Sequence, residues 1–432
     1  MTWKRRHRLR TFLKSSLWPF PLACMILALP VARLVLWIDR LTGSTAGISA
    51  DAARTVAGTL AAAVLSFIVF VFSVLLVALQ LASVQLTPRV IARMFRDPVA
   101  KLALGVFVFT FTYTLVVMAR LEDPVPFWSV MLCGYGSLAC VGVFVFMIDR
   151  LGKELRPVRI VTAVAAEGRR VIQSVYPERL GAENEAEERA ERVPLGPASR
   201  VLEHRGPSAV LLAFDDEGLF RLACRAGCVI ELVPQVGDFV ATDDPLFRIY
   251  SPPGRGPETT PQQAPVAEAL LRHSVVFGAE RTLEQDPAYA FRIIVDIAAK
   301  ALSPAINDPT TAVLALDQIH HLLRQVGLRH LDTGCVKDEK GQVRLLYRTP
   351  DWEDFVCLAV TEIRQFGRGS IQIARRLRLL LEKLIDALPE HRAARLREEL
   401  SLLHRGVERS FQDPEDQTRA DVGDSQGVGG SE

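Results

Sequence analysis

The chain has 432 residues, of which 49% are hydrophobic, and its mean hydropathy of +0.20 is high for a soluble protein. Its formal net charge is only +2 and no concentrated basic domain occurs, which argues against a nucleic-acid partner. The length leaves room for two or three domains, and the hydropathy indicates that one of them lies in a membrane.

Four apolar segments are long enough to cross a bilayer as helices. They are 18–38, 56–86, 102–119 and 127–148, each near or above the ~20 residues that span ~30 Å of hydrocarbon. A cleaved signal peptide is the rival interpretation of the first segment. We favour a retained span, because that run is too long for a signal peptide and because its removal would leave an odd number of spans.

The distribution of Lys and Arg predicts how the spans are oriented, since positively charged loops tend to stay in the cytoplasm. Basic residues gather in the tail 1–17, in the loop between spans two and three, and directly after span four. The loops 39–55 and 120–126 carry few charges, which nearly balance. We therefore expect a multi-pass protein of the bacterial inner membrane, with a transmembrane domain at 18–150 and both termini in the cytoplasm.

Span two is unusually long, because its 31 residues would extend about 46 Å as an α-helix. Its cytoplasmic end carries Gln80, Ser83 and Gln85, and it is expected to tilt or to project toward the soluble part. These polar side chains either line a transport pathway or bond neighbouring helices. The second interpretation is favoured, because no acidic or basic residue lies at mid-membrane, where ion and proton carriers usually need one.

The rest of the chain is polar enough to be soluble, and its pattern changes along its length. We expect a helix and acidic linker at 151–200, a small β module at 201–250, a proline-rich linker at 251–265, an α-helical domain at 266–410 with one hairpin near 337–350, and a disordered tail at 411–432. The predicted fold class is a mainly α membrane protein. It combines a four-helix transmembrane domain with a cytoplasmic α+β region, made of a small β barrel-sandwich-like module and an α-helical domain.

The β module ends in VGDFVATDDPLFRI, which resembles the closing hairpin of biotinyl and lipoyl carrier domains. Such a carrier needs a lysine to acylate, and no lysine occurs between Lys153 and Lys300. Neither group can therefore be attached here, and the sequence predicts no cofactor. The remaining expectation is a barrel-sandwich that acts as a spacer or docking module.

Enzyme and metal motifs are missing from the sequence. It contains no phosphate-binding loop, no nucleophile elbow and no His-Glu-x-x-His helix. Cys224 and Cys228 resemble half of a zinc site, but a second ligand pair is missing. Asp317 and His321 share a helical face and could hold a metal, although a solvated polar face is the commoner meaning of that spacing. We predict no catalytic residue and no metal.

Arginines are dense on a predicted helix near residue 370. The basic residues that could touch anionic lipid are Arg364, Arg368, Arg375, Arg376 and Arg378. An apolar stripe follows the same helix through Leu377, Leu380, Leu381, Leu384 and Leu388. The stripe favours a core helix, or a helix that packs on a partner, over a lipid-binding surface.

The most distinctive stretch is ALSPAINDPTTAVLALD at 301–317. Pro304 should end the helix that starts near Tyr289, and Asp308 followed by Pro309 is a strong signal for the start of a new helix. A tight corner between two helices is the simpler interpretation.

A ligand pocket is the alternative, because charged residues are dense among the apolar residues around this stretch. The candidate ligand-binding residues are Arg281, Asp286, Asp296, Asn307 and Asp308, and the polar membrane candidates are Gln80 and Gln85. The sequence favours the corner and leaves the pocket open.

Several motifs resemble those of one protein family. They are VALQLASVQLTPRV, LGVFVFTFTYTLVV, GDFVATDDPL, ERTLEQDPAYAFRIIVDIAAKALSPAINDPTTAV and EIRQFGRGS. Together they resemble a family of predicted bacterial inner-membrane proteins, domain of unknown function 2254, over nearly the whole chain. The resemblance implies fold and location, and it brings no established activity, substrate or catalytic residue.

The sequence therefore favours a non-enzymatic membrane module. It is expected to be a channel or transporter-like oligomer, or a regulatory scaffold whose cytoplasmic part senses or docks a ligand. The expected partners are the lipid bilayer, further copies of the chain in a homo-oligomer, and a cytoplasmic protein or small molecule, with no nucleic acid. The alternative is a membrane-tethered enzyme that uses the acidic residues near Asp296 and Asp308.

Reporter fusions test the orientation. Because the basic segments stay in the cytoplasm, we expect fusions after Thr45 and Pro124 to be periplasmic, and fusions after Asp97 and at the C-terminus to be cytoplasmic. A periplasmic C-terminus would contradict the four-span arrangement.

Overall fold

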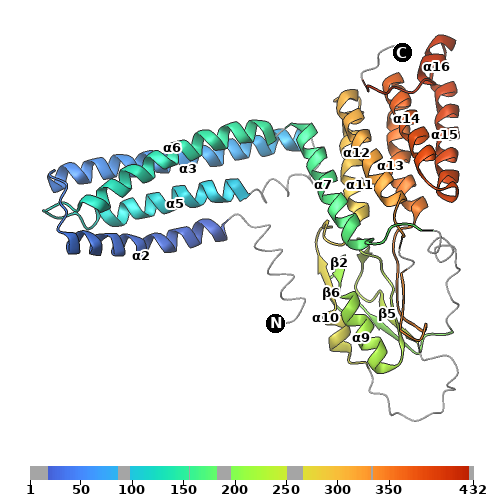
Figure 1. Ribbon diagram of the computed structural model, residues 1–432, viewed down its shortest axis with the longest axis horizontal. Coiled ribbons are helices and arrows are strands. Elements are labelled where there is room, and N and C mark those ends of the chain that lie inside the picture. Colours follow the sequence, from blue (N-terminus) through green and yellow to red (C-terminus); the bar gives the residue numbers. More distant parts are fainter. Residues whose placement is uncertain are drawn as a thin grey trace. The chain divides into compact units, whose positions relative to one another are not determined.

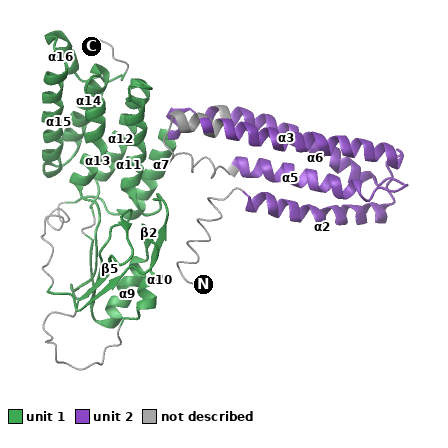
Figure 2. Cartoon of the chain, turned by 180° about the vertical axis from the view of Figure 1, so that it is seen from behind, with its two compact units in different colours: residues 1–8, 161–432 green, residues 9–160 purple. Residues whose placement is uncertain are grey.

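A computed structural model of the protein (Figure 1) describes residues 18–85, 98–154, 156–181, 196–250, 266–331 and 334–427. The chain divides into two compact units, with the boundary at Ile160 and Val161 (Figure 2). The predictions for the basic tail 1–17, for most of the acidic linker and for the proline-rich linker 251–265 lie outside the described residues.

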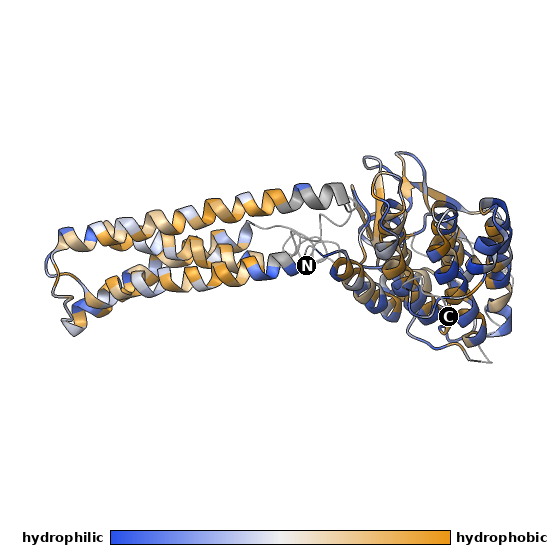
Figure 3. Cartoon of the chain, turned by 90° about the horizontal axis from the view of Figure 1, so that it is seen from above, coloured by the Kyte–Doolittle hydropathy of each residue, from blue (hydrophilic) through white to orange (hydrophobic). Residues whose placement is uncertain are grey.

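In chain order the first unit, which is drawn in purple and keyed as unit 2 in Figure 2, is a bundle of long apolar helices. They are α2 (Pro19–Thr42), α3 (Ala50–Gln85), α5 (Pro98–Met118) and α6 (Phe127–Glu154). All four are long and apolar enough to cross a membrane, and hydrophobic residues cover most of their length in Figure 3. The four predicted spans are confirmed as long apolar helices. Helix α3 begins six residues before the predicted span, because Ala50–Thr55 continue the helix beyond the apolar run.

Helix α5 is the centre of this bundle, because it packs more extensively than any other helix against its three neighbours. Its apolar stretch is 44% buried, compared with 17% for each of the others. Close approach to α2 occurs at Gly105, where an added Cβ would lie 2.6 Å from the ring of Phe20. Ala28 and Ala32 of α2 are completely buried. Small residues serve this purpose in membranes, since helix association there depends on close packing.

Two aspartates close the end of the bundle at which the α2–α3 and α5–α6 loops lie. Asp39, in α2, accepts hydrogen bonds from the backbone N–H groups of Trp128 (2.8 Å) and Ser129 (2.9 Å) and from the hydroxyl of Ser129 (2.6 Å). Asp123 accepts one from the N–H of Ala50 (3.0 Å). The first N–H groups of a helix have no partner within it. Each aspartate therefore caps a helix to which it does not belong, α6 for Asp39 and α3 for Asp123.

Asp39 is 4% exposed, so its replacement should be costly. We expect Asp39→Ala to lower the free energy of unfolding by about 1–3 kcal/mol, because buried donors lose their acceptor. Asp39→Asn should lose less, since its amide oxygen still accepts. The measurement is the midpoint of thermal unfolding in detergent, monitored by tryptophan fluorescence.

The matched control is Asp51→Ala in the first turn of α3. Asp51 is 94% exposed and pairs with Arg54 at the surface, and exposed pairs contribute little. Equal midpoints for Asp39→Ala and Asp51→Ala would contradict the capping role.

The second unit in chain order, which is drawn in green and keyed as unit 1 in Figure 2, begins within α7 (Pro157–Val175), at Val161, and continues into a β region. Its strands are β1 (Arg200–Glu203), β2 (Ala209–Phe214), β3 (Val229–Leu232), β4 (Phe239–Val240), β5 (Pro245–Tyr250), β6 (Val275–Gly278), β7 (Cys335–Lys337) and β8 (Val343–Tyr347). One sheet has the order β1-β5-β3-β8-β7 and the other the order β4-β2-β6. Both contribute to a single core, which includes Leu211 of β2 and Phe247 of β5.

The β region differs from the prediction in two respects. Helix α9 (Asp216–Ala226) interrupts the strands, and Asp215 caps it by accepting from the N–H of Gly218 (3.0 Å). The predicted hairpin forms as β7 and β8, but β8 pairs in parallel with β3, with Leu345 opposite Ile230. The segment 201–250 is therefore completed by strands from outside it. The α+β character is confirmed, whereas the barrel-sandwich detail is not.

The remaining helices of this unit are mostly longer and pack on one another. They are α10 (Glu268–His273), α11 (Pro287–Ala301), α12 (Pro309–Gly327), α13 (Trp352–Phe366), α14 (Ile371–Ala387), α15 (Glu390–Ser410) and α16 (Pro414–Ala420). From α11 onward each helix also packs on the next but one, so that α11, α13 and α15 form one layer and α12, α14 and α16 the other (Figure 1). We call this arrangement the helical array.

Arginine–carboxylate pairs join helices within each layer of the helical array. The pairs are Arg292 with Glu362, Arg364 with Glu399, Arg376 with Asp317, and Arg378 with Asp421. The buried guanidinium of Arg392 acts differently, because it donates to the carbonyl oxygens of Val326 (3.1 Å) and Arg329 (3.0 Å) at the end of α12. A cation is favourable at a helix C-terminus.

The segment 411–427 is structured, in contrast to the disordered tail expected at 411–432. Asp413 caps α16 by accepting from the N–H of Glu415 (2.8 Å). The guanidinium groups of Arg375 and Arg376 then donate to the carbonyl oxygens of Val422 (3.0 Å) and Asp424 (2.8 Å). The composition of the segment is a poor guide here, because side chains of α14 hold its backbone. Residues 428–432 lie outside the described part.

Candidate functional site

The five predicted ligand-binding residues lie at three places along α11. Arg281 and Asp286 are at its start, Asp296 is in its interior, and Asn307 and Asp308 follow its end. The ten residues from Asp286 to Asp296 extend about 15 Å as helix. The structure does not bring the five together.

Asp286 and Arg281 join the β region to α11. Asp286 is 3% exposed, caps α11 through the N–H of Tyr289 (3.0 Å) and accepts from Nη2 of Arg281 (2.6 Å). Burial raises the pKa of Asp286, and the nearby Arg281 opposes this rise. The guanidinium lies over the ring of Tyr289 and against Gly237, where an added Cβ would be 2.4 Å from it. These contacts give the pair a structural role.

Asp296 is part of an ion-pair cluster that joins α11 to α13. Arg292 donates through both terminal nitrogens to Glu362 (2.5 and 2.6 Å) and through Nε to Asp296 (2.6 Å). The hydrogen bonds that Arg292 donates to Glu362, and then the one that it donates to Asp296, raise the pKa of Arg292 above its ordinary value. Asp296 is thus held by an arginine whose terminal nitrogens are bound to Glu362.

Asp308 caps α12, as the sequence predicts. Its carboxylate accepts from the backbone N–H (3.1 Å) and the hydroxyl (2.5 Å) of Thr311, and Pro309 occupies the first turn. Asn307 has a φ of 48°, in the left-handed region that asparagine tolerates. The corner between the two helices is therefore confirmed, and ligand binding at this stretch stays a prediction.

The polar membrane candidates lie near the end of α3. Gln80 has an exposed side chain, and Gln85 is the last residue of the helix. Whether either amide lines a pathway stays a prediction.

A different set of residues surrounds a cavity of about 360 Å³ at one end of the helical array. The end of α13, the start of α14 and the last turns of α15 form its walls. Its arginines are Arg364, Arg368, Arg405 and Arg409, and its larger apolar side chains are Ile373, Leu377, Leu402, Leu403 and Val407. We call this site the arginine groove.

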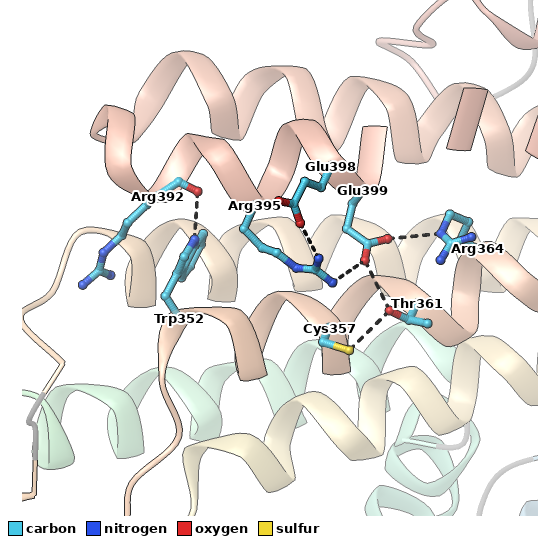
Figure 4. A network of polar contacts seen from close by, with 8 residues as sticks. All are labelled: Trp352, Cys357, Thr361, Arg364, Arg392, Arg395, Glu398 and Glu399. Carbon is cyan, nitrogen blue, oxygen red and sulfur yellow. Dashed lines mark hydrogen bonds and ion pairs between the residues drawn. The ribbon is translucent and has the colours of Figure 1, made fainter. Parts of the chain in front are cut away.

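A buried carboxylate holds Arg364 at the groove (Figure 4). Glu399 is 1% exposed and accepts from Nε of Arg364 (3.1 Å), from Arg395 (2.9 Å) and from the hydroxyl of Thr361 (3.5 Å). A buried carboxylate needs such partners to offset the loss of water. Hydrogen bonding to Glu398 raises the pKa of Arg395 in turn. The network fixes α15 against α13 and with it one wall of the groove.

The other three arginines have no carboxylate partner. The guanidinium groups of Arg368, Arg405 and Arg409 form no hydrogen bond or ion pair with any of the described residues. Arg405 and Arg409 are one turn apart on α15, and Arg368 lies between α13 and α14. Helix α14 also begins at this rim, and the partial positive charge at its N-terminus has the same sign. Uncompensated guanidinium groups around an apolar hollow suit an anion that carries an apolar part.

The sequence indicated only half of this set. The sequence identified Arg364 and Arg368 among the basic residues that could touch anionic lipid. The other three of these residues, Arg375, Arg376 and Arg378, form hydrogen bonds with the C-terminal segment or with α12. The sequence did not mark Arg405 and Arg409. The available signal was their spacing of four residues, which places both on one face of α15. Within the described residues no group of three or more His, Cys, Asp and Glu is placed to hold a metal ion.

Four apolar helices of spanning length, followed by a large α+β region, are the features of an integral membrane protein. The chain belongs to the predicted membrane protein family DUF2254, whose model matches residues 14–383. It is similar to uncharacterized proteins of Mycobacterium bovis and Mycobacterium tuberculosis, with 26% identity over an alignment of 428 residues that covers 95% of this chain and 80% of each relative. No solved structure matches the chain. The resemblance seen in the sequence motifs is confirmed.

Substitution of Asp308 separates a cap from a ligand site. If Asp308 acts only as a cap, the variants Asp308→Asn and Asp308→Ser should keep most of the stability of the parent protein. Asp308→Ala should lower the free energy of unfolding by about 0.5–2 kcal/mol. Thermal unfolding measures the difference. An Asn variant as stable as the parent protein but without its function would show that the charge itself is used.

Proposed function

We propose that the protein is a membrane-anchored, non-enzymatic sensing module that binds an anionic ligand in the arginine groove. The supporting observation is the cavity of about 360 Å³ with three arginines that have no partner among the described residues. Unpaired cations repel one another, and a bound anion would relieve this repulsion. We further propose that the protein lies in the bacterial inner membrane as a homo-oligomer, with both termini in the cytoplasm.

A channel or transporter has weaker support from the first unit. The charged side chains of the described spanning helices gather near the helix ends, apart from Arg33, which faces outward from the bundle. Ion and proton carriers usually place ionisable groups in the bundle interior. The sensing role therefore takes precedence over transport.

A membrane-tethered enzyme also has weaker support, because the two acids that it would need already have partners. Asp296 is bound by Arg292, and Asp308 caps α12. The β region fits the role of a spacer or docking module, since its two sheets share one core while Val201 and Phe239 remain exposed.

Anion-dependent stabilisation tests the proposal. The thermal midpoint of the full-length protein in detergent is measured with increasing inorganic phosphate, with ionic strength held constant by chloride. We expect phosphate to raise the midpoint, because a ligand that binds only the folded state stabilises it, by about 2.7 kcal/mol at 100 times Kd. The double variant Arg405→Ala, Arg409→Ala should lose most of this response.

Arg397→Ala is the matched control, because Arg397 lies on the same helix but pairs with Glu390 (2.5 Å). An identical phosphate response in all three proteins, or none in the parent, would contradict the proposal. Ion flux through liposomes that contain the protein would instead support the channel interpretation.

A further inference from the structure

The side chains of the arginine groove restrict the chemical class of ligand that it can bind. This inference rests on the proposed function. We infer that the groove binds a phosphate monoester with a short aliphatic body. Such a group occurs both in soluble alkyl phosphates and in a membrane lipid such as phosphatidic acid.

The arrangement of charge favours a dianionic head. Arg405 and Arg409 approach from α15, while Arg368 approaches from the α13–α14 loop, so one anion between them bridges two parts of the fold. Guanidinium groups match phosphate oxygens in bidentate geometry. A carboxylate offers two oxygens and one charge to three cations, whereas a phosphate monoester offers three oxygens and about two charges. Phosphate therefore compensates this site more completely.

Arg364 adds a fixed donor at the same wall. Its Nε is used by Glu399 (3.1 Å), and that carboxylate is itself held by Arg395 (2.9 Å). A guanidinium has five donors, so further donors of Arg364 remain for a ligand. An arginine held in position loses less conformational freedom on binding than one that is free.

The floor of the groove favours an aliphatic body. Ile373 and Leu377 of α14 and Leu403 and Val407 of α15 line it, and each is at most 5% exposed. The described residues that line the groove include no aromatic side chain. A nucleobase would thus find no ring on which to stack. Alkyl groups need no such partner and gain by leaving water.

The size of the groove favours a small molecule. Its volume of about 360 Å³ lies near the lower end of the ~300–1,000 Å³ typical of small-ligand sites. A folded protein would need a far larger contact area. The aliphatic body is therefore short, or only the head and first carbons of a longer lipid enter.

Calorimetric titration of the full-length protein in phosphatidylcholine nanodiscs tests the inference. The probe is octyl phosphate, with inorganic phosphate, octanol and octanoate as comparisons, and a titration of empty nanodiscs is subtracted. Because head and body both contribute, we expect octyl phosphate to bind at least about ten-fold more tightly than each of the other three. Arg405→Ala with Arg409→Ala should remove this preference, and Arg397→Ala should retain it.

The origin of the phosphate is found by replacing part of the nanodisc lipid with phosphatidic acid. Competition with octyl phosphate would assign the site to a lipid headgroup, and lack of competition would assign it to a soluble compound. Both outcomes support the phosphate monoester.

Failure of the inference and failure of the proposed function give different results. If inorganic phosphate or octanoate binds as tightly as octyl phosphate, and the double variant weakens that binding, the inferred class is wrong while the anion-sensing role stands. If none of the anions binds, or the double variant binds like the parent, both are wrong.

Discussion

The burial of Glu399 is the constraint on which the arginine groove depends. A carboxylate that is 1% exposed is stable only when surrounding donors replace its water. Arg364 comes from α13 and Arg395 from α15 itself (Figure 4). The cost of leaving that charge unpaired therefore fixes the spacing of two helices. The groove opens between these helices and α14, so its shape is set by a carboxylate that lies behind its wall.

The membrane unit uses the same physical device at its loop end. Asp39 satisfies the first backbone donors of α6, and Asp123 satisfies one of α3. In both units a carboxylate on one helix or loop binds groups on another. In the bundle these groups are backbone N–H donors that have no partner within their own helix, and in the helical array they are guanidinium groups. The difference lies in what this geometry supports. In the bundle it orders the loops, whereas in the helical array it leaves neighbouring arginines without a partner among the described residues.

Local patterns predict those features that are determined locally. Apolar runs identify the four transmembrane helices, and Asp308 with Pro309 marks the start of α12. Features that depend on distant segments are not visible in the same way. The pairing of Leu345 with Ile230 joins strands more than a hundred residues apart, and the ordering of 421–427 depends on arginines of α14. The sequence predicts no groove for the same reason, because Arg405 and Arg409 line one cavity with Arg368 only after α15 folds back on α13 and α14.

The parallel pairing of β8 with β3 limits how the soluble unit can be divided. The hairpin that carries β8 lies between α12 and α13 in sequence, so the central sheet is completed from within the helical region. A fragment that ends before Val266 would leave one edge of β3 with unsatisfied backbone groups, and such edges promote aggregation. Expression of the β region as a separate piece would therefore yield an incomplete sheet. The soluble unit should be inherited, and exchanged between proteins, as a whole.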